Sequence, residues 1–124
     1  GVSSDMREIT TAAKQGNEKA ILSLEMYEQR ITKYVGAFAA EMGGVDIIVF
    51  TGGVGEHQSS TRANVCKPLR FMGVEIDDAA NDANNGDEGI ISTPNSAVKV
   101  VVIPTDEEYM IAKDTEAIIE GREP

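Results

Sequence analysis

The chain has 124 residues, of which 41% are hydrophobic, and a formal net charge of −10 at pH 7. This length allows one domain or part of one, and the hydrophobic content is ordinary for a soluble globular protein with a buried core. The negative charge argues against a surface that binds nucleic acid or an anionic membrane. No apolar run reaches the roughly 18 residues expected of a membrane-spanning helix. We therefore expect neither a nucleic-acid nor a membrane partner.

The chain contains one cysteine, Cys66, and one histidine, His57. A single cysteine cannot form an internal disulfide, which agrees with a reducing cytoplasm, and the pair excludes a Cys/His zinc cluster within this chain. We expect Cys66 to be a small buried apolar side chain rather than a nucleophile. The sequence starts at Gly1 without a methionine, inside a predicted loop, so we expect it to be a piece of a longer protein.

Two helices are predicted at the start of the chain. Ser4 or Asp5 can cap the first, Asp5 and Glu8 have capping-box spacing, and the helix should end near residue 14. Asn17 should cap a long second helix that ends at the glycines of residues 43–44. Its apolar residues recur at intervals of three and four: Ile21, Leu24, Tyr27, Ile31, Tyr34, Val35, Phe38 and Met42. This stripe predicts a core-facing or dimer-facing helix rather than a ligand site.

The most informative stretch spans residues 46–58. Residues 47–50, Ile-Ile-Val-Phe, predict a short strand buried on both faces, as in parallel sheets. Residues 51–55, Thr-Gly-Gly-Val-Gly, follow, and a helix is predicted from about Ser59 to Arg70. A strand, a glycine turn and a helix in this order place free backbone amides at a helix N-terminus, which suits an anion.

The pattern alone leaves two readings of this glycine stretch open. A P-loop would need Lys-Ser or Lys-Thr after the last glycine, but Glu56 and His57 stand there. A dinucleotide loop would need a further glycine at position 58, which is Gln58. The pattern therefore supports a purely structural turn and a nucleotide site equally. For His57 we favour a polar helix-entry residue or a ligand contact over a general base.

The rest of the chain predicts shorter elements. The helix of residues 59–70 carries Arg62, Val65, Cys66 and Leu69 at helical spacing. Later segments are predicted as a short strand or extended segment (71–77), a short helix followed by a solvated loop (77–89), a possible strand (90–92), a turn (94–96) and a second buried strand (98–103). Pro104 should end that strand. The order of elements implies an α/β layer with at least two parallel strands.

A final helix is predicted from Thr105, which forms a capping box with Glu108. One face should carry Ile111, Thr115, Ile118 and Ile119, and the helix should end near Gly121. On the pattern alone, the acidic run of residues 106–108 has a structural explanation, because acids stabilise a helix N-terminus.

Residues 50–56, Phe-Thr-Gly-Gly-Val-Gly-Glu, resemble the adenosine motif of the acetate and sugar kinase, actin and heat-shock chaperone superfamily, and most closely its acetate kinase version. Four stretches resemble the C-terminal region of acetate kinases in order: residues 1–7, 48–56, 62–73 and 103–112. The resemblance implies an α/β fold, the C-terminal part of an actin-like ATPase (ribonuclease H-like) domain with mostly parallel strands covered by helices. Residues 1–124 would be a C-terminal nucleotide-binding fragment without its N-terminal domain.

The resemblance also implies particular site residues. The nucleotide-binding residues carried over are Asp5, Met6, Arg7, Gly53, Val54, Gly55, Glu56 and His57. The first three should contact adenosine, with the planar guanidinium of Arg7 suited to stacking on a base. His57 stands where the family usually has Asn. Glu107 corresponds to the carboxylate associated with Mg²⁺, and Asp106 beside it stands where Asn is common.

The implied reaction is the Mg²⁺- or Mn²⁺-dependent, reversible transfer of a phosphoryl group between ATP and acetate, giving acetyl phosphate and ADP. The family's catalytic residues belong to the absent domain, so no catalytic residue is assigned here and the chain alone should be inactive. A propionate kinase is the alternative within the family. The isolated chain could also be a non-catalytic nucleotide-binding or dimerisation module. We expect a cytoplasmic homodimer that uses the helix of residues 24–42.

Overall fold

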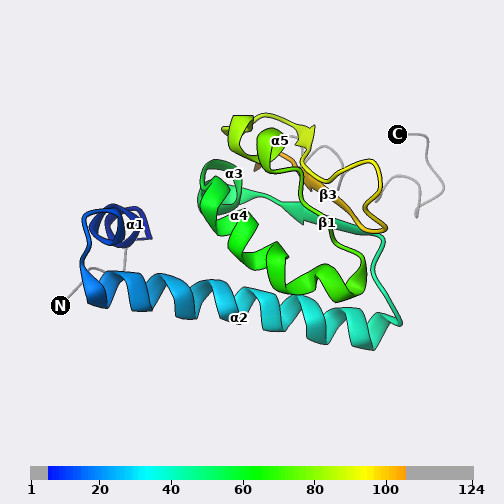
Figure 1. Ribbon diagram of the computed structural model, residues 1–124, viewed down its shortest axis with the longest axis horizontal. Helices are drawn as coiled ribbons and strands as arrows, with labels where there is room; N and C mark the ends of the chain where they lie inside the picture. The colour runs from blue at the N-terminus through cyan, green and yellow to red at the C-terminus, as the bar shows by residue number, and fades with distance from the viewer. Residues whose placement is uncertain (1–5, 106–124) are drawn as a thin grey trace, which may run out of the picture.

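The computed structural model describes residues 6–105 (Figure 1). In chain order the elements are α1 (Met6–Lys14), α2 (Glu18–Met42), β1 (Ile47–Phe50), α3 (Gly52–His57), α4 (Ser59–Cys66), a 3₁₀ helix η1 (Lys67–Met72), α5 (Asp78–Ala83), β2 (Gly89–Ile90) and β3 (Lys99–Val102). Within this part of the chain, no helix is both long and apolar enough to cross a membrane.

The first two helices begin and end where local sequence signals predict. The Asn17 side chain accepts a hydrogen bond from the Ala20 amide at 3.0 Å and caps α2. Gly43, with φ of 77°, ends it in the left-handed conformation that glycine adopts most easily. Helix α1 ends at Lys14, as predicted, and packs on α2. The predicted cap of α1 at Ser4 or Asp5 lies outside the described residues.

The sheet confirms the α/β class and the parallel pair. Its strand order is β1-β3-β2, and β1 runs parallel to β3 with Ile47 opposite Lys99 and Phe50 opposite Val102. Strand β2 pairs with β3 in the antiparallel direction. The expectation of mostly parallel strands therefore holds for β1 and β3 but not for β2, and the described part of the sheet is mixed. The antiparallel pair arises because residues 91–98 turn the chain back along its neighbour without a crossover helix.

The core lies between one face of this sheet and α4 with η1. Alternate residues of β1 and β3 point into it: Ile48, Phe50, Val100 and Val102. Val65 of α4 and Leu69 of η1 meet them from the helical layer. Helix α2 packs against the outside of α4, so the layers run sheet, α4 and α2 (Figure 1).

The prediction that β1 is buried on both faces is wrong. Ile48 and Phe50 are each 9% exposed, whereas Ile47 is 52% and Val49 is 46% exposed. The same alternation runs along β3, where Lys99 is exposed and Val100 is buried. The reason is that α4 covers only one face of the strand, and adjacent residues of a strand point to opposite faces.

The apolar stripe of α2 is divided between two surroundings. Ile31 and Val35 pack against the core, which confirms the core-facing prediction for them. Tyr34, Phe38 and Met42 are 59%, 57% and 66% exposed, so these three do not face the core, and the alternative that they face a second copy of the chain stays a prediction. The rings of Tyr34 and Phe38 stack on each other with centroids 6.5 Å apart. A single helix face can meet α4, and these three side chains lie away from it.

The segment after α4 departs from two predictions. The α-helix ends at Cys66, short of Arg70, and continues as the 3₁₀ helix η1. Pro68 explains this, because its nitrogen cannot donate the hydrogen bond that an α-helix needs. Residues 71–72 belong to η1, where a short strand or extended segment was predicted. Beyond Gly73, Val74 and Ile76 form only isolated bridges, to Val98 and Ser92.

The predicted short helix and turn that follow are confirmed. Asp77 caps α5 by accepting a hydrogen bond from the Ala80 amide at 3.0 Å. The turn of residues 94–96 closes with a bond from the Ser96 amide to the Thr93 carbonyl. The final predicted helix, from Thr105 through its capping residue Glu108, lies almost wholly outside the described residues.

Candidate functional site

The glycine stretch forms a short helix where a turn was expected. Gly52, separated from the end of β1 by Thr51 alone, has φ of 76°, a conformation that side-chain-bearing residues rarely adopt. From there α3 runs to His57 in helical geometry. A Cβ atom at Gly55 would lie 3.5 Å from the Phe50 carbonyl carbon, so α3 folds back onto the end of β1. The prediction of an open glycine turn is corrected because only Gly52 takes positive φ.

A buried arginine ties α3 to the rest of the molecule. Arg62 of α4 is 0% exposed, and its Nη1 donates to the Gly55 carbonyl at 3.1 Å. Its Nε donates to Asn81 Oδ1 at 2.8 Å, and its Nη2 donates to the carbonyls of Asn81 and Asn84 at 2.9 and 2.8 Å. We call these contacts the Arg62 network. Burial lowers the pKa of Arg62, but a guanidinium remains protonated in proteins.

The loop after α5 completes this arrangement. The Asn84 Oδ1 accepts from the Gly86 amide at 3.0 Å, and its Nδ2 donates to the Asp87 carbonyl at 2.8 Å. Gly86 has φ of 103°, and a Cβ there would lie 2.5 Å from Cε1 of His57. The His57 ring therefore lies directly against this loop. The chain needs glycine at this position both for its backbone angle and for the close approach of the ring.

From the sequence, Arg62 was predicted only as a member of a helical stripe, and its role in holding α3 was not predicted. One signal was available: Arg62 shares that stripe with Val65, Leu69 and Cys66, and Cys66 was expected to be buried, so a charged residue stood beside an apolar, partly buried face. A buried arginine needs several hydrogen-bond acceptors. Asn81 and Asn84 supply them from 19 and 22 residues along the chain, a distance that helical spacing cannot reveal.

The predicted nucleotide-binding residues lie on two separate elements. Met6, half-buried, and Arg7, exposed, stand in the first turn of α1. Gly53, Gly55 and His57 lie in α3, with Val54 and Glu56 placed there by their backbone. Figure 1 shows α1 over the N-terminal part of α2 and α3 beyond β1. Asp5 and Glu107 lie outside the described residues, so a ligand shared by all these residues stays a prediction.

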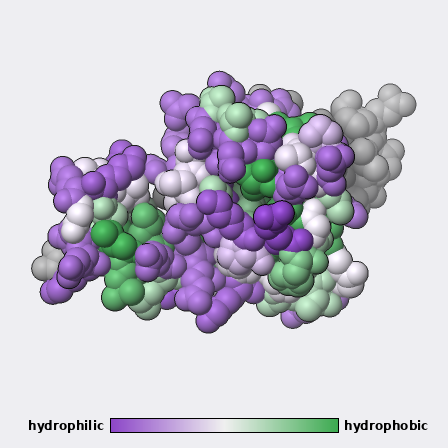
Figure 2. Space-filling model, viewed as in Figure 1, coloured by the Kyte–Doolittle hydropathy of each residue, from purple (hydrophilic) through white to green (hydrophobic). Residues whose placement is uncertain are grey.

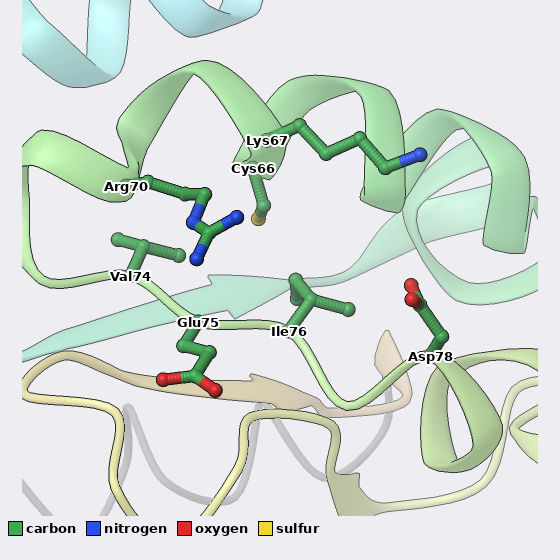
Figure 3. A pocket seen from close by; sticks show the side chains of 7 residues that line it. All are labelled: Cys66, Lys67, Arg70, Val74, Glu75, Ile76 and Asp78. Atoms are coloured by element: carbon green, nitrogen blue, oxygen red, sulfur yellow. The ribbon is translucent and has the colours of Figure 1, made fainter.

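A separate pocket lies between the α4–η1 segment and residues 74–78. It encloses about 190 Å³ and is lined by Cys66, Lys67, Arg70, Val74, Glu75, Ile76 and Asp78. Figure 3 shows Lys67 and Arg70 on its helical side and Glu75 and Asp78 opposite them. Its volume falls below the roughly 300 Å³ at which small-molecule sites begin. Among the described residues, none of the predicted site residues lines it, so it gives no support to a nucleotide site away from α3.

Cys66 at the inner wall of this pocket is expected to be unreactive in the folded protein. It is 1% exposed, and burial raises the pKa of its thiol to about 12. The thiolate, which is the reactive form, is then scarcer at pH 8 by roughly a thousandfold than for an ordinary cysteine. Ellman's reagent should therefore label no thiol in the native chain and one thiol in denaturant. Rapid labelling of the native chain would contradict this placement.

A second polar contact that the sequence reasoning missed joins α2 to α4. Glu28 of α2 is 5% exposed, and both of its carboxylate oxygens accept from Asn64 Nδ2, at 3.2 and 3.3 Å. Nearby, Thr32 Oγ1 donates to the Val65 carbonyl at 3.0 Å. Burial raises the pKa of Glu28, although the hydrogen bond from Asn64 opposes this. The charged carboxylate is therefore less stable here than in the unfolded chain.

Glu28→Gln should consequently stabilise the chain at pH 7. When the pKa of a carboxyl is higher in the folded state than in the unfolded state, its ionisation lowers the free energy of unfolding at pH values above the folded pKa. Below the unfolded pKa the carboxyl is protonated in both states, and this penalty disappears. Glutamine keeps an oxygen for Asn64 and removes the charge. We expect a gain of up to about 1 kcal/mol at pH 7 that vanishes near pH 4, since solvent screens part of the effect. Urea denaturation at both pH values measures it, with Glu41→Gln, an exposed glutamate near the C-terminal end of α2, as control. A stability loss at pH 7 would contradict this reasoning.

Within residues 6–105, no group of three or more His, Cys, Asp or Glu side chains could hold a metal ion. The face in Figure 2 is largely hydrophilic, with apolar groups over the N-terminal part of α2 and near its C-terminal end. The described part of the chain is thus an α/β layer whose conspicuous local feature is a short glycine-rich helix fixed by a buried arginine.

The fold is that of an α/β protein: helices α3 and α4 follow β1 along the chain, and the later strand β3 pairs with β1 in the parallel direction. Its family follows from the sequence: the profile of the acetokinase family matches residues 1–113, and the chain belongs to that family. The resemblance of the glycine stretch and its neighbours to acetate kinases is thereby confirmed.

Individual relatives agree. The chain is 60% identical over 119 residues to an acetate kinase of Porphyromonas gingivalis strain W83, covering 96% of this chain and 30% of the relative. It is 57% identical over 121 residues to an acetate kinase of Thermotoga maritima, covering 97% of this chain and 30% of the relative. It therefore spans about 30% of the length of these relatives. The predicted C-terminal position within them stays a prediction, because this share alone gives no position.

Solved structures show the same fold. The crystal structure of the Porphyromonas gingivalis acetate kinase matches with a TM-score of 0.83 at 59% identity, over 96% of this chain and 30% of that one. A propionate kinase from Francisella tularensis matches with a TM-score of 0.72 at 36% identity, over 87% of this chain and 27% of that one. Structural similarity thus extends to two kinases that differ in the acid named as their substrate.

Proposed function

We propose that this chain is part of an acetate kinase, an enzyme that reversibly transfers a phosphoryl group between ATP and acetate to give acetyl phosphate and ADP. The observation that carries the proposal is the 60% identity over 119 residues to an acetate kinase. This chain contributes nucleotide-binding residues from an actin-like ATPase layer. A domain outside the chain supplies the acid-binding and catalytic groups, so the chain alone is inactive.

The adenosine part of the nucleotide contacts Asp5, Met6 and Arg7. The rest of the cleft is formed by residues 53–57. Two features of the structure support these roles: Arg7 lies exposed in the first turn of α1, and Gly53 is exposed, with no atom of the described residues within 4 Å of a Cβ position. A ligand can therefore approach the backbone at Gly53 closely.

The metal is Mg²⁺, or Mn²⁺ in its place, associated with Glu107. Mg²⁺ is commonly held by one or two carboxylates together with substrate phosphates and water, so a single carboxylate from this chain fits its chemistry. When bound, the ion neutralises phosphate charge during transfer. The neighbouring Asp106 increases the negative charge around Glu107 and favours a cation there.

The protein acts in the cytoplasm as a homodimer. The supporting observation is the exposed apolar group Tyr34, Phe38 and Met42 on α2, which a second copy of the chain would cover. Light scattering of the 124-residue chain tests this proposal. A strict monomer at high concentration argues against α2 as the dimer surface.

A propionate kinase is the second candidate, favoured by the structural match to such an enzyme. Acetate takes precedence because the acetate kinase relatives reach 60% identity, against 36% for that match. For the isolated chain, a non-catalytic nucleotide-binding or dimerisation module remains the third candidate.

The deciding experiment measures acyl phosphate formation by the full-length protein that carries this chain, with ATP and either acetate or propionate. A higher kcat/KM for acetate, abolished by EDTA and restored by Mg²⁺, is the expected result. Absence of product from both acids would overturn the proposal. Titration of the 124-residue chain with Mg-ATP, followed by amide chemical shifts, then tests the nucleotide site. Shifts should cluster at Arg7, residues 53–57 and Glu107.

A further inference from the structure

We propose that Arg62 is a positioning residue that holds the backbone of α3 in its nucleotide-binding conformation through the Arg62 network. The inference rests on the proposed function, because it assigns α3 to the nucleotide. It goes beyond that function by naming a residue that acts from behind the site, with no contact to the ligand.

The acceptors of the Arg62 network fix positions of the backbone. Three of its four hydrogen bonds end on main-chain carbonyls, those of Gly55, Asn81 and Asn84. The fourth ends on Asn81 Oδ1, and Asn81 Nδ2 in turn donates to the Ser59 carbonyl at 2.9 Å. A rigid guanidinium with five donors can hold several acceptors in one fixed arrangement. The network therefore joins α3, the start of α4 and the end of α5.

Helix α3 needs such external support. It has six residues, and three of them are glycines, the residue that favours helices least after proline. A helix this short is also unstable by itself. Its conformation must come from tertiary contacts, and the Gly55 carbonyl lies in its second half, where an Arg62 donor reaches it.

The same network reaches α3 a second time through the loop after α5. Arg62 Nη2 donates to the Asn84 carbonyl, and Asn84 Oδ1 accepts from the Gly86 amide. The His57 ring lies against Gly86. Gly55 and the last residue of α3 are thus fixed to one buried side chain. A substitution that removes the guanidinium should therefore move the backbone of residues 52–57, although none of the residues proposed to contact the nucleotide is itself replaced.

Arg62→Lys tests the inference, because lysine keeps the charge but cannot reproduce the forked set of bonds. In the full-length enzyme we expect the KM for ATP to rise about tenfold, the KM for acetate to change less than about twofold, and Gly52–His57 amides of the nucleotide-free chain to shift. Arg70→Lys, an exposed arginine of η1 outside the network, is the matched control and should leave all three unchanged.

Asn81→Ala is the second variant, and it decides the question if Arg62→Lys does not fold. It removes one acceptor of the network and leaves the cation and its backbone acceptors in place. The KM for ATP should rise about threefold, with smaller amide shifts over the same residues. In folded variants, an unchanged KM for ATP, or amides of α3 that do not move, would overturn the inference. Equal rises of both KM values would also overturn it.

Failure of the proposed function gives a different result. In that case the unmodified enzyme forms no acyl phosphate at all, while the amide shifts of α3 in Arg62→Lys still test the network. The dissociation constant for Mg-ATP, measured by titration of the two folded variants and the unmodified chain, then takes the place of KM. Equal ATP affinity would overturn the positioning role, and about tenfold weaker binding by Arg62→Lys would support it.

Discussion

Leu69→Ala should lower the free energy of unfolding by about 3 kcal/mol, within the range measured for buried leucines. Leu69 is 1% exposed and packs in the core cluster between η1 and the sheet. Truncation removes apolar contacts and leaves a cavity, because closely packed neighbours can fill the space only in part. Since domains of this size are stable by about 5–15 kcal/mol, the loss should be plain in urea denaturation followed by circular dichroism.

Phe71→Ala provides the matched control. It lies two residues away in the same 3₁₀ helix but is 82% exposed, so its truncation should change stability by no more than about 0.5 kcal/mol. Equal losses in the two variants would contradict the placement of Leu69 in the core and Phe71 on the surface.

Gly73→Ala should destabilise the chain by about 2–4 kcal/mol. Gly73 has φ of 92°, and a Cβ atom there would lie 2.7 Å from the Cβ of Ala97. The backbone cannot move aside easily, because the Gly73 carbonyl accepts hydrogen bonds from the amides of Ala97 and Val98 and from the Ser96 hydroxyl. Thermal and urea denaturation of the variant measure the loss.

Two further variants separate the causes of that loss. Gly36→Ala lies inside α2, with no atom within 4 Å of the new Cβ, and should stabilise the chain by about 0.5–1 kcal/mol. Adding Ala97→Gly to Gly73→Ala removes the clash but leaves the unfavourable φ, so part of the stability should return. A stable Gly73→Ala variant would contradict both the backbone angle and the close approach to Ala97.

These effects bear on the proposed function because core and site share elements. Leu69 in η1 and Arg62 in α4 belong to one continuous helical segment, with its core side against β1 and β3. The same segment holds α3 through the Arg62 network. Core variants should therefore be compared at temperatures where each is fully folded, so that a change in nucleotide binding is measured on the native state.

Features decided by neighbouring residues could be read from the sequence. Asn17 and Gly43 set the ends of α2, and Asp77 starts α5, because a cap acts on amides or carbonyls within about four positions. The order of elements predicted the α/β class and the parallel pair of β1 and β3, and four short motifs predicted the family. Pro68 was also a local signal for the end of α4, although the prediction continued that helix to Arg70.

Tertiary structure alone decided the features that depend on distant residues. Burial of β1 on one face depends on where α4 lies, since Ile47 and Ile48 are equally apolar in the sequence yet only Ile48 meets the helical layer. The role of Arg62 depends on Asn81 and Asn84, and the environment of Glu28 depends on Asn64, 36 residues away. Local propensity and capping act over one or two helical turns, whereas burial and buried hydrogen bonds arise only when the chain brings such residues together.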